Sequence, residues 1–236
     1  DEACCPTGQT PTPVQVGPDG RDQAHPALVA AAGDAPQKNT WLAGWAEGSE
    51  LHLQHLDADG MGMGTPKTRT LDTIIGLTLA ASSSDYLAVT ALDGTVGSDL
   101  VAYRYGAGWG GDGTQMPIDS RKTGKFLNPA AAIDGTTLWV AYSSGVANTA
   151  HAIKVAGIDV TDGKVTTGPV TITNTGRRLP QPGAPAITVV DGTPTVAWWD
   201  APNSLIRGVR LKGKAVKNQF TVSVQRVNSV VAEPIA

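Results

Sequence analysis

The sequence predicts an all-β protein built as a β-propeller-like array of four-stranded antiparallel blades. An apolar opening segment recurs about every 50 residues, which is the length of one propeller blade. Glycine and proline are spread along the chain, and Asp-Gly pairs stand between alternating apolar stretches. We therefore expect four complete repeats and the start of a fifth, with a β-sandwich as the alternative fold.

The opening segments set the expected repeat boundaries. They begin at Pro26, Gly76, Pro129 and Pro185, and a partial copy begins at Pro234. The expected repeats cover about residues 24–73, 74–126, 127–179 and 180–226, and a partial repeat covers 227–236. Self-similarity at such a period indicates units that must stack to bury their apolar faces.

The composition favours short strands over helices. The 236 residues include 28 Gly and 16 Pro, more than long helices accept. Apolar residues make up 41% of the chain, which is enough for a core. Charged residues make up only 17%, which argues against a disordered or coiled-coil chain.

Within each repeat, the second and third strands have recognisable patterns. The second strand is rich in aromatic and β-branched residues, which favour a pleated, half-buried surface. It is expected at residues 41–45, 86–90, 138–142 and 195–199. The third strand is clearest at 205–211, where alternate side chains are expected on opposite faces.

Tight turns are expected at four Asp-Gly pairs. Both residue types tolerate the positive φ of two-residue hairpin turns. The pairs are Asp93-Gly94, Asp134-Gly135, Asp162-Gly163 and Asp191-Gly192. Turn chemistry and strand pattern therefore agree.

This succession of apolar opening, Asp-Gly, aromatic-ended strand and outer strand resembles the repeats of bacterial secreted and surface β-propeller-like proteins. Residues 129–173 and 185–224 match best, and weaker copies extend over about 24–236. The resemblance implies a propeller-like fold and an extracytoplasmic location. The Asp-box of sialidases is not found in the sequence, and neither is the combination of Gly-His with Trp-Asp that marks WD repeats.

Residues 1–23 read as a flexible leader rich in Pro and Thr. It contains Cys4 and Cys5, the only cysteines of the chain. Adjacent thiols do not have the spacing of a structural zinc site. We expect them to form a disulfide, with each other or with another chain, or to carry a lipid.

Charge and hydropathy exclude two classes of partner. The net charge is −3, and no basic run exceeds two residues, so the electrostatic footprint of a nucleic-acid-binding protein is missing. No stretch approaches the roughly 20 apolar residues of a spanning helix. We therefore expect no nucleic-acid partner and no transmembrane segment.

One segment carries residue types that bind metals. His52, His55, Asp57 and Asp59 lie close together, followed by two methionines. Imidazole and thioether suit copper, and an Asp-x-Asp-Gly sequence suits calcium. However, His52 and His55 point to opposite faces of a strand, and calcium needs more oxygen ligands. An ordinary solvated hairpin is the alternative.

Three tryptophans are candidates for contact with a ligand. Trp198 and Trp199 are adjacent on a strand and must point to opposite faces, so one of them should be less buried. Trp109 lies in a glycine-rich loop. The alternative for the strand tryptophans is packing between neighbouring blades.

The sequence favours a non-enzymatic extracytoplasmic binding or structural module, such as an accessory subunit of a surface or envelope assembly. Its expected partner is a protein or second chain that completes the propeller, with glycans as a further option. The alternatives are a carbohydrate-binding lectin and a hydrolase or metal-dependent enzyme with a site at the propeller axis. No catalytic residue is assigned, because no nucleophile, zinc or phosphate-loop motif is present in the sequence.

Overall fold

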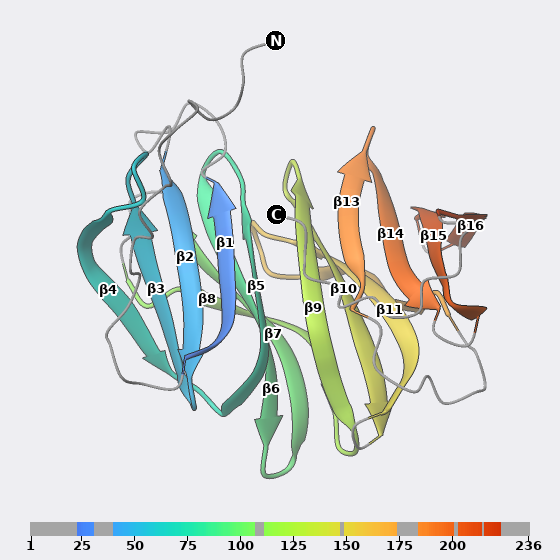
Figure 1. Ribbon diagram of the computed structural model, residues 1–236, viewed down its shortest axis with the longest axis horizontal. Coiled ribbons are helices and arrows are strands. Elements are labelled where there is room, and N and C mark those ends of the chain that lie inside the picture. The colour runs from blue at the N-terminus through green and yellow to red at the C-terminus, as the bar shows by residue number, and fades with distance from the viewer. Residues whose placement is uncertain are drawn as a thin grey trace, which may run out of the picture.

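The computed structural model describes residues 23–30, 40–106, 111–146, 149–173, 184–200, 203–213 and 215–222. Within these ranges the chain forms sixteen strands in four separate four-stranded sheets, with no helix. All pairing is antiparallel, and each sheet uses four strands that are consecutive in the chain (Figure 1). The expected all-β array of four-stranded sheets is therefore confirmed.

The sheets are named by their order in the chain. The first contains β1 (Ala24–Ala30), β2 (Trp41–Glu47), β3 (Glu50–Leu56) and β4 (Gly62–Thr70). The second contains β5 (Thr73–Ala81), β6 (Asp85–Gly94), β7 (Gly97–Gly106) and β8 (Thr114–Arg121). The third contains β9 (Lys125–Asp134), β10 (Thr137–Val146), β11 (Thr149–Asp159) and β12 (Val165–Thr171). The fourth contains β13 (Ala186–Val190), β14 (Thr193–Asp200), β15 (Leu205–Lys212) and β16 (Ala215–Thr221).

Local turn chemistry explains the hairpins. Asp191 and Gly192, between β13 and β14, have φ values of 50° and 68°. Two successive positive φ values match the right-handed twist of the flanking strands, which makes this the favoured two-residue hairpin turn. Gly163, after β11, also has a positive φ of 72°. The expected two-residue turn is confirmed at Asp191-Gly192, whereas Gly163 lies in a longer turn between β11 and β12. The expected turn at Asp93-Gly94 is wrong, because both residues still belong to β6 and pair with Ser98 and Gly97.

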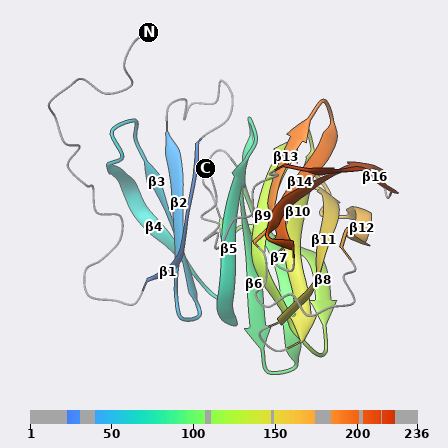
Figure 2. The same ribbon diagram turned by 45° about the vertical axis from the view of Figure 1, so that its right-hand side comes forward.

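The four sheets follow one another in an arc. Their first strands, β1, β5, β9 and β13, contact each other in that order and line one side of it. Figures 1 and 2 show the first and fourth sheets at opposite ends of the described array, which is not closed into a ring. Each end sheet therefore has one face packed on a neighbour and one face turned outward.

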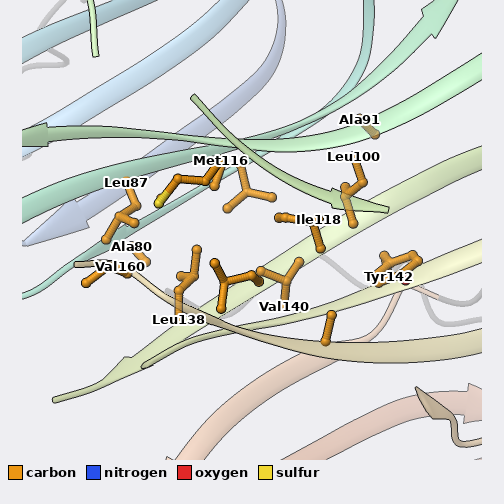
Figure 3. Close-up of a cluster of buried hydrophobic side chains, with 14 of the residues drawn as sticks. Ala80, Leu87, Ala91, Leu100, Met116, Ile118, Leu138, Val140, Tyr142 and Val160 are labelled. Atoms are coloured by element: carbon orange, nitrogen blue, oxygen red, sulfur yellow. The ribbon is translucent and has the colours of Figure 1, made fainter. Parts of the chain in front are cut away.

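Buried apolar side chains fill the three spaces between successive sheets. The middle space, between the second and third sheets, is drawn in Figure 3. Its largest members come from both sheets: Leu87, Leu100, Met116, Ile118, Phe126, Leu138, Tyr142 and Ile158. The core is thus distributed between blades and not gathered in one centre, as expected for repeats that stack on their neighbours.

Polar contacts also join the second sheet to the third. Arg104 donates from Nε to Asp85 Oδ1 at 2.7 Å and from Nη1 to the Val160 carbonyl at 2.8 Å. The Tyr142 hydroxyl donates to Asp119 Oδ2 at 2.8 Å. Burial, together with the nearby Asp119 carboxylate, raises the pKa of Tyr142, so this hydroxyl remains a donor.

Several expectations fall outside the described ranges. They concern Cys4 and Cys5, most of the leader 1–23 and the partial repeat 227–236. Among the residues that are described, no helix has the length and hydropathy needed to cross a bilayer.

Candidate functional site

The outward faces of the two end sheets each carry exposed apolar side chains. On the first sheet, the register pairs Leu28 with Ala43 across β1 and β2, on the face opposite the packed Leu42. On the fourth sheet, Phe220 pairs with Gly208, and Gly208 pairs with Ala197, on the face opposite the packed Val196. Leu28 and Phe220 therefore point away from the neighbouring sheets.

Exposed large hydrophobic residues concentrate on these two end sheets and their hairpins. Of the ten such residues in the described part of the chain, four belong to the first sheet and four to the fourth. The eight are Leu28, Trp41, Met61, Met63, Val190, Val216, Phe220 and Val222. Exposed apolar residues on a terminal sheet are candidates for an interaction surface.

A carboxylate and imidazole group lies at the β2–β3 hairpin, on the outward face of the first sheet. Glu47 ends β2, Glu50 begins β3 and His52 follows two residues later. His52 Nε2 lies 3.8 Å from Glu47 Oε2 and 3.5 Å from Glu50 Oε2. One ligand atom from each residue falls within 4.8 Å of the other two, a grouping able to hold a metal ion. We call these three residues the hairpin triad.

Neighbouring side chains orient the hairpin triad. The Trp45 indole donates from Nε1 to Glu47 Oε1 at 3.1 Å. The Trp45 ring also stacks on the His52 ring, with centroids 5.3 Å apart and planes within 8°. Thr68 Oγ1 lies 3.1 Å from His52 Nδ1. The Glu47 carboxylate is thus held through Oε1 and the His52 imidazole through Nδ1. Neither of these atoms is the one that faces the other members of the triad.

The metal set expected from the sequence is not brought together. His52 and His55 point to opposite faces of β3, because His52 stacks on Trp45 while His55 meets Tyr86 of the second sheet at 4.9 Å between centroids. Asp57 Oδ1 accepts from the amides of Asp59 and Met61 at 3.0 and 2.8 Å. Asp57 therefore caps a turn, and the structure groups His52 with Glu47 and Glu50 in place of the aspartates.

Sequence reasoning did not identify Glu47 and Glu50. The available signal was the Glu-Gly-Ser-Glu stretch between two apolar strands, with Gly48 at a positive φ of 60°. A two-residue hairpin places its two flanking residues opposite each other, and Glu47 indeed pairs with Glu50. Like-charged residues directly opposite repel each other, so this pairing is itself an indication of a site.

His55 should make stability depend on pH. Burial lowers the pKa of His55 from its ordinary value of 6.5, because the charged ring loses solvation. The unfolded chain then takes up a proton more readily than the folded one, so the free energy of unfolding should fall as pH drops from about 7 to about 5. Urea unfolding across this range should show a weaker decline for His55→Gln than for the original chain. If the free energy of unfolding declined equally with pH in both proteins, His55 would not be the residue responsible for the pH dependence.

The tryptophans expected to contact ligands have different positions. Trp198 is buried in the cluster between the third and fourth sheets, so it is a core residue. Trp199 points to the outward face and is only partly buried, as the alternation predicts. The expectation of a contact surface on this strand therefore applies to Trp199 alone. Trp109 lies outside the described residues.

Comparison with known proteins finds no matching family model and no matching curated protein. Solved structures do match. A mutant of the apocarotenoid oxygenase of Synechocystis covers 89% of this chain at a TM-score of 0.53 and 12% identity. An exo-β-1,3-galactanase from Phanerochaete chrysosporium, solved with β-1,3-galactotriose, covers 85% at a TM-score of 0.50 and 11% identity.

This chain has a β-propeller-like fold. The similarity to the two solved structures and the four consecutive sheets support that conclusion. The similarity concerns the fold alone. The chain matches 54% of the oxygenase and 50% of the galactanase, so it spans about half the length of both structures. The propeller-like array predicted from the repeats is confirmed.

Proposed function

We propose that this chain is a non-enzymatic extracytoplasmic binding module that completes its propeller with a second polypeptide. One observation carries the proposal: within the described residues the arc is open, and exposed apolar residues lie on its two end sheets. Repeat arrays need terminal units with polar outer faces to remain soluble alone. End sheets with Leu28 and Phe220 on their outward faces lack that protection.

The partner that symmetry favours is a second copy of this chain. Two arcs of four sheets make a ring of eight, within the usual range of four to eight blades. The outward face of the first sheet of one copy would pack on the outward face of the fourth sheet of the other. A twofold axis repeats this contact and closes the ring. Closure covers both apolar faces at once.

The test places a charge on the outward face of each end sheet, at Leu28 of β1 and at Phe220 of β16. Leu28→Asp and Phe220→Asp should each convert a concentration-dependent dimer into a monomer, measured by sedimentation equilibrium. A buried aspartate has to be desolvated on docking, which opposes association. Val96→Asp is the matched control, because Val96 is 87% exposed on a hairpin of the second sheet, away from both faces. It should leave the dimer intact.

Two outcomes would overturn the proposal. One is an original chain that stays monomeric at every attainable concentration. The other is dimerisation that Leu28→Asp and Phe220→Asp leave unchanged, because the interface would then lie elsewhere. Circular dichroism of each variant, compared with the original chain, verifies that the sheets remain folded.

A further inference from the structure

We infer that the hairpin triad, formed by Glu47, Glu50 and His52, is a binding site for a divalent transition-metal ion of the zinc type. The site lies on the outward face of the first sheet and is independent of any catalytic role. Two carboxylates and one imidazole are ligands that zinc accepts in proteins. Four features of the structure support the assignment.

The first feature is an unpartnered nitrogen aimed at the carboxylates. His52 is only 9% exposed, and its Nε2 atom is buried without a hydrogen-bond partner. The atoms nearest to it in the triad are Glu50 Oε2 at 3.5 Å and Glu47 Oε2 at 3.8 Å, too far for good hydrogen bonds. A buried nitrogen left in this state loses solvation without compensation, and a metal ion would supply the missing interaction.

The second feature is the spacing of the donor atoms. Zinc bonds of about 2.0–2.2 Å place tetrahedral ligands about 3.4 Å apart. The imidazole-to-carboxylate separations of 3.5 and 3.8 Å are close to that value. The Glu50 side chain is 42% exposed, so it has room to adjust when an ion binds. Three protein ligands leave one tetrahedral position for water or an external ligand.

The third feature is the set of contacts behind the ligands. Metal-binding histidines usually donate their other ring N–H to a fixed acceptor, which sets the tautomer. Thr68 Oγ1, 3.1 Å from His52 Nδ1, is placed to accept that hydrogen and leave the Nε2 lone pair toward the carboxylates. The Trp45 indole holds Glu47 Oε1, which leaves Oε2 on the side of the imidazole. The site is therefore preorganised.

The fourth feature is a comparison within the same chain. In the β14–β15 hairpin of the fourth sheet, Trp198 pairs with Arg207 as Trp45 pairs with His52 in the first sheet. There the strand ends in Asp200, whose Oδ2 accepts from Arg207 Nε. A guanidinium remains protonated and cannot bind a metal. The first sheet differs by placing a ligating imidazole at this position.

The chemistry of the set decides between metals. Calcium takes six to eight oxygen ligands, which two carboxylates do not supply, and imidazole is a poor ligand for it. Mixed nitrogen and oxygen donors suit zinc and its neighbours in the first transition row. Zinc is the probe of choice, because it has no redox chemistry and does not impose a geometry.

The experiment is titration of the full chain with zinc, measured by calorimetry and by equilibrium dialysis with elemental analysis. Cys4 and Cys5 are alkylated first, so that their thiols do not contribute. The original chain should bind one zinc ion per chain. His52→Arg, which copies the arrangement of the fourth sheet, should weaken zinc binding at least tenfold.

Two further variants complete the design. Glu50→Gln keeps the size of an exposed side chain, so it should fold normally and also weaken zinc binding about tenfold. Asp59→Asn removes an exposed carboxylate of the neighbouring turn, outside the triad, and should bind zinc as the original chain does. If the alkylated chain binds no zinc, or if His52→Arg and Glu50→Gln bind it like Asp59→Asn, the inference is wrong. The dimer test described above does not depend on this result.

Discussion

Replacing Leu138 with alanine is expected to lower the free energy of unfolding by about 2–5 kcal/mol, the usual cost of truncating a fully buried leucine. Leu138 lies on β10 and has no exposed surface. It packs in the cluster between the second and third sheets (Figure 3). A cavity there removes packing contacts from both sheets.

Leu28→Ala is the matched control for Leu138→Ala. The chemical change is the same, but Leu28 is 48% exposed on the outward face of the first sheet. In the monomer its loss should cost well under about 1 kcal/mol, the scale of ordinary surface substitutions. Urea unfolding at low protein concentration gives both values. Equal losses would mean that the outward face is packed as tightly as the spaces between sheets, contrary to the open arc.

Gly124→Ala should be among the most damaging single-methyl substitutions in the chain. Gly124 lies in the turn between β8 and β9, which carries the chain from the second sheet to the third. Its φ is +92°, and an added Cβ would stand 2.2 Å from the Gly145 carbonyl oxygen, a backbone atom of β10. Backbone strain alone accounts for about 1–3 kcal/mol, and the clash adds to it by forcing the turn away from β10.

Gly135→Ala separates the two effects. Gly135 also has a positive φ, +55°, but an added Cβ would meet no atom within 4 Å. Only the conformational term remains, about 1–2 kcal/mol. The midpoint temperature of thermal unfolding should therefore be clearly lower for Gly124→Ala than for Gly135→Ala. If the two variants unfold at the same temperature, the close approach of the turn to β10 has no energetic effect.

Local patterns predicted much of the fold, because each blade is made of neighbouring stretches of chain. Alternation at residues 205–211 placed Arg207 and Val209 on one face, and their register partners Trp198 and Val196 share that face. The Asp191-Gly192 turn followed from residue type alone. These features depend on interactions within about ten residues, which a single sequence contains.

The candidate site was predicted less well, for a physical reason. His52 was predicted as a metal ligand from its residue type, but together with the nearby Asp57 and Asp59. Strand pairing instead places Glu47 opposite Glu50, and turns Trp45 and Thr68 toward His52 from two adjacent strands. Which side chains meet across a sheet depends on register, and one residue of slip exchanges the faces.

The sequence by itself determined that this chain is an array of four small antiparallel sheets, because strand alternation and turn residues act over short distances. Only the tertiary structure decided that the arc stays open within the described residues, that Trp198 is core while Trp199 faces outward, and that two glutamates and a histidine converge at one hairpin. Those outcomes depend on how sheets pack and pair, and packing between blades is set by side chains about 50 residues apart in the chain.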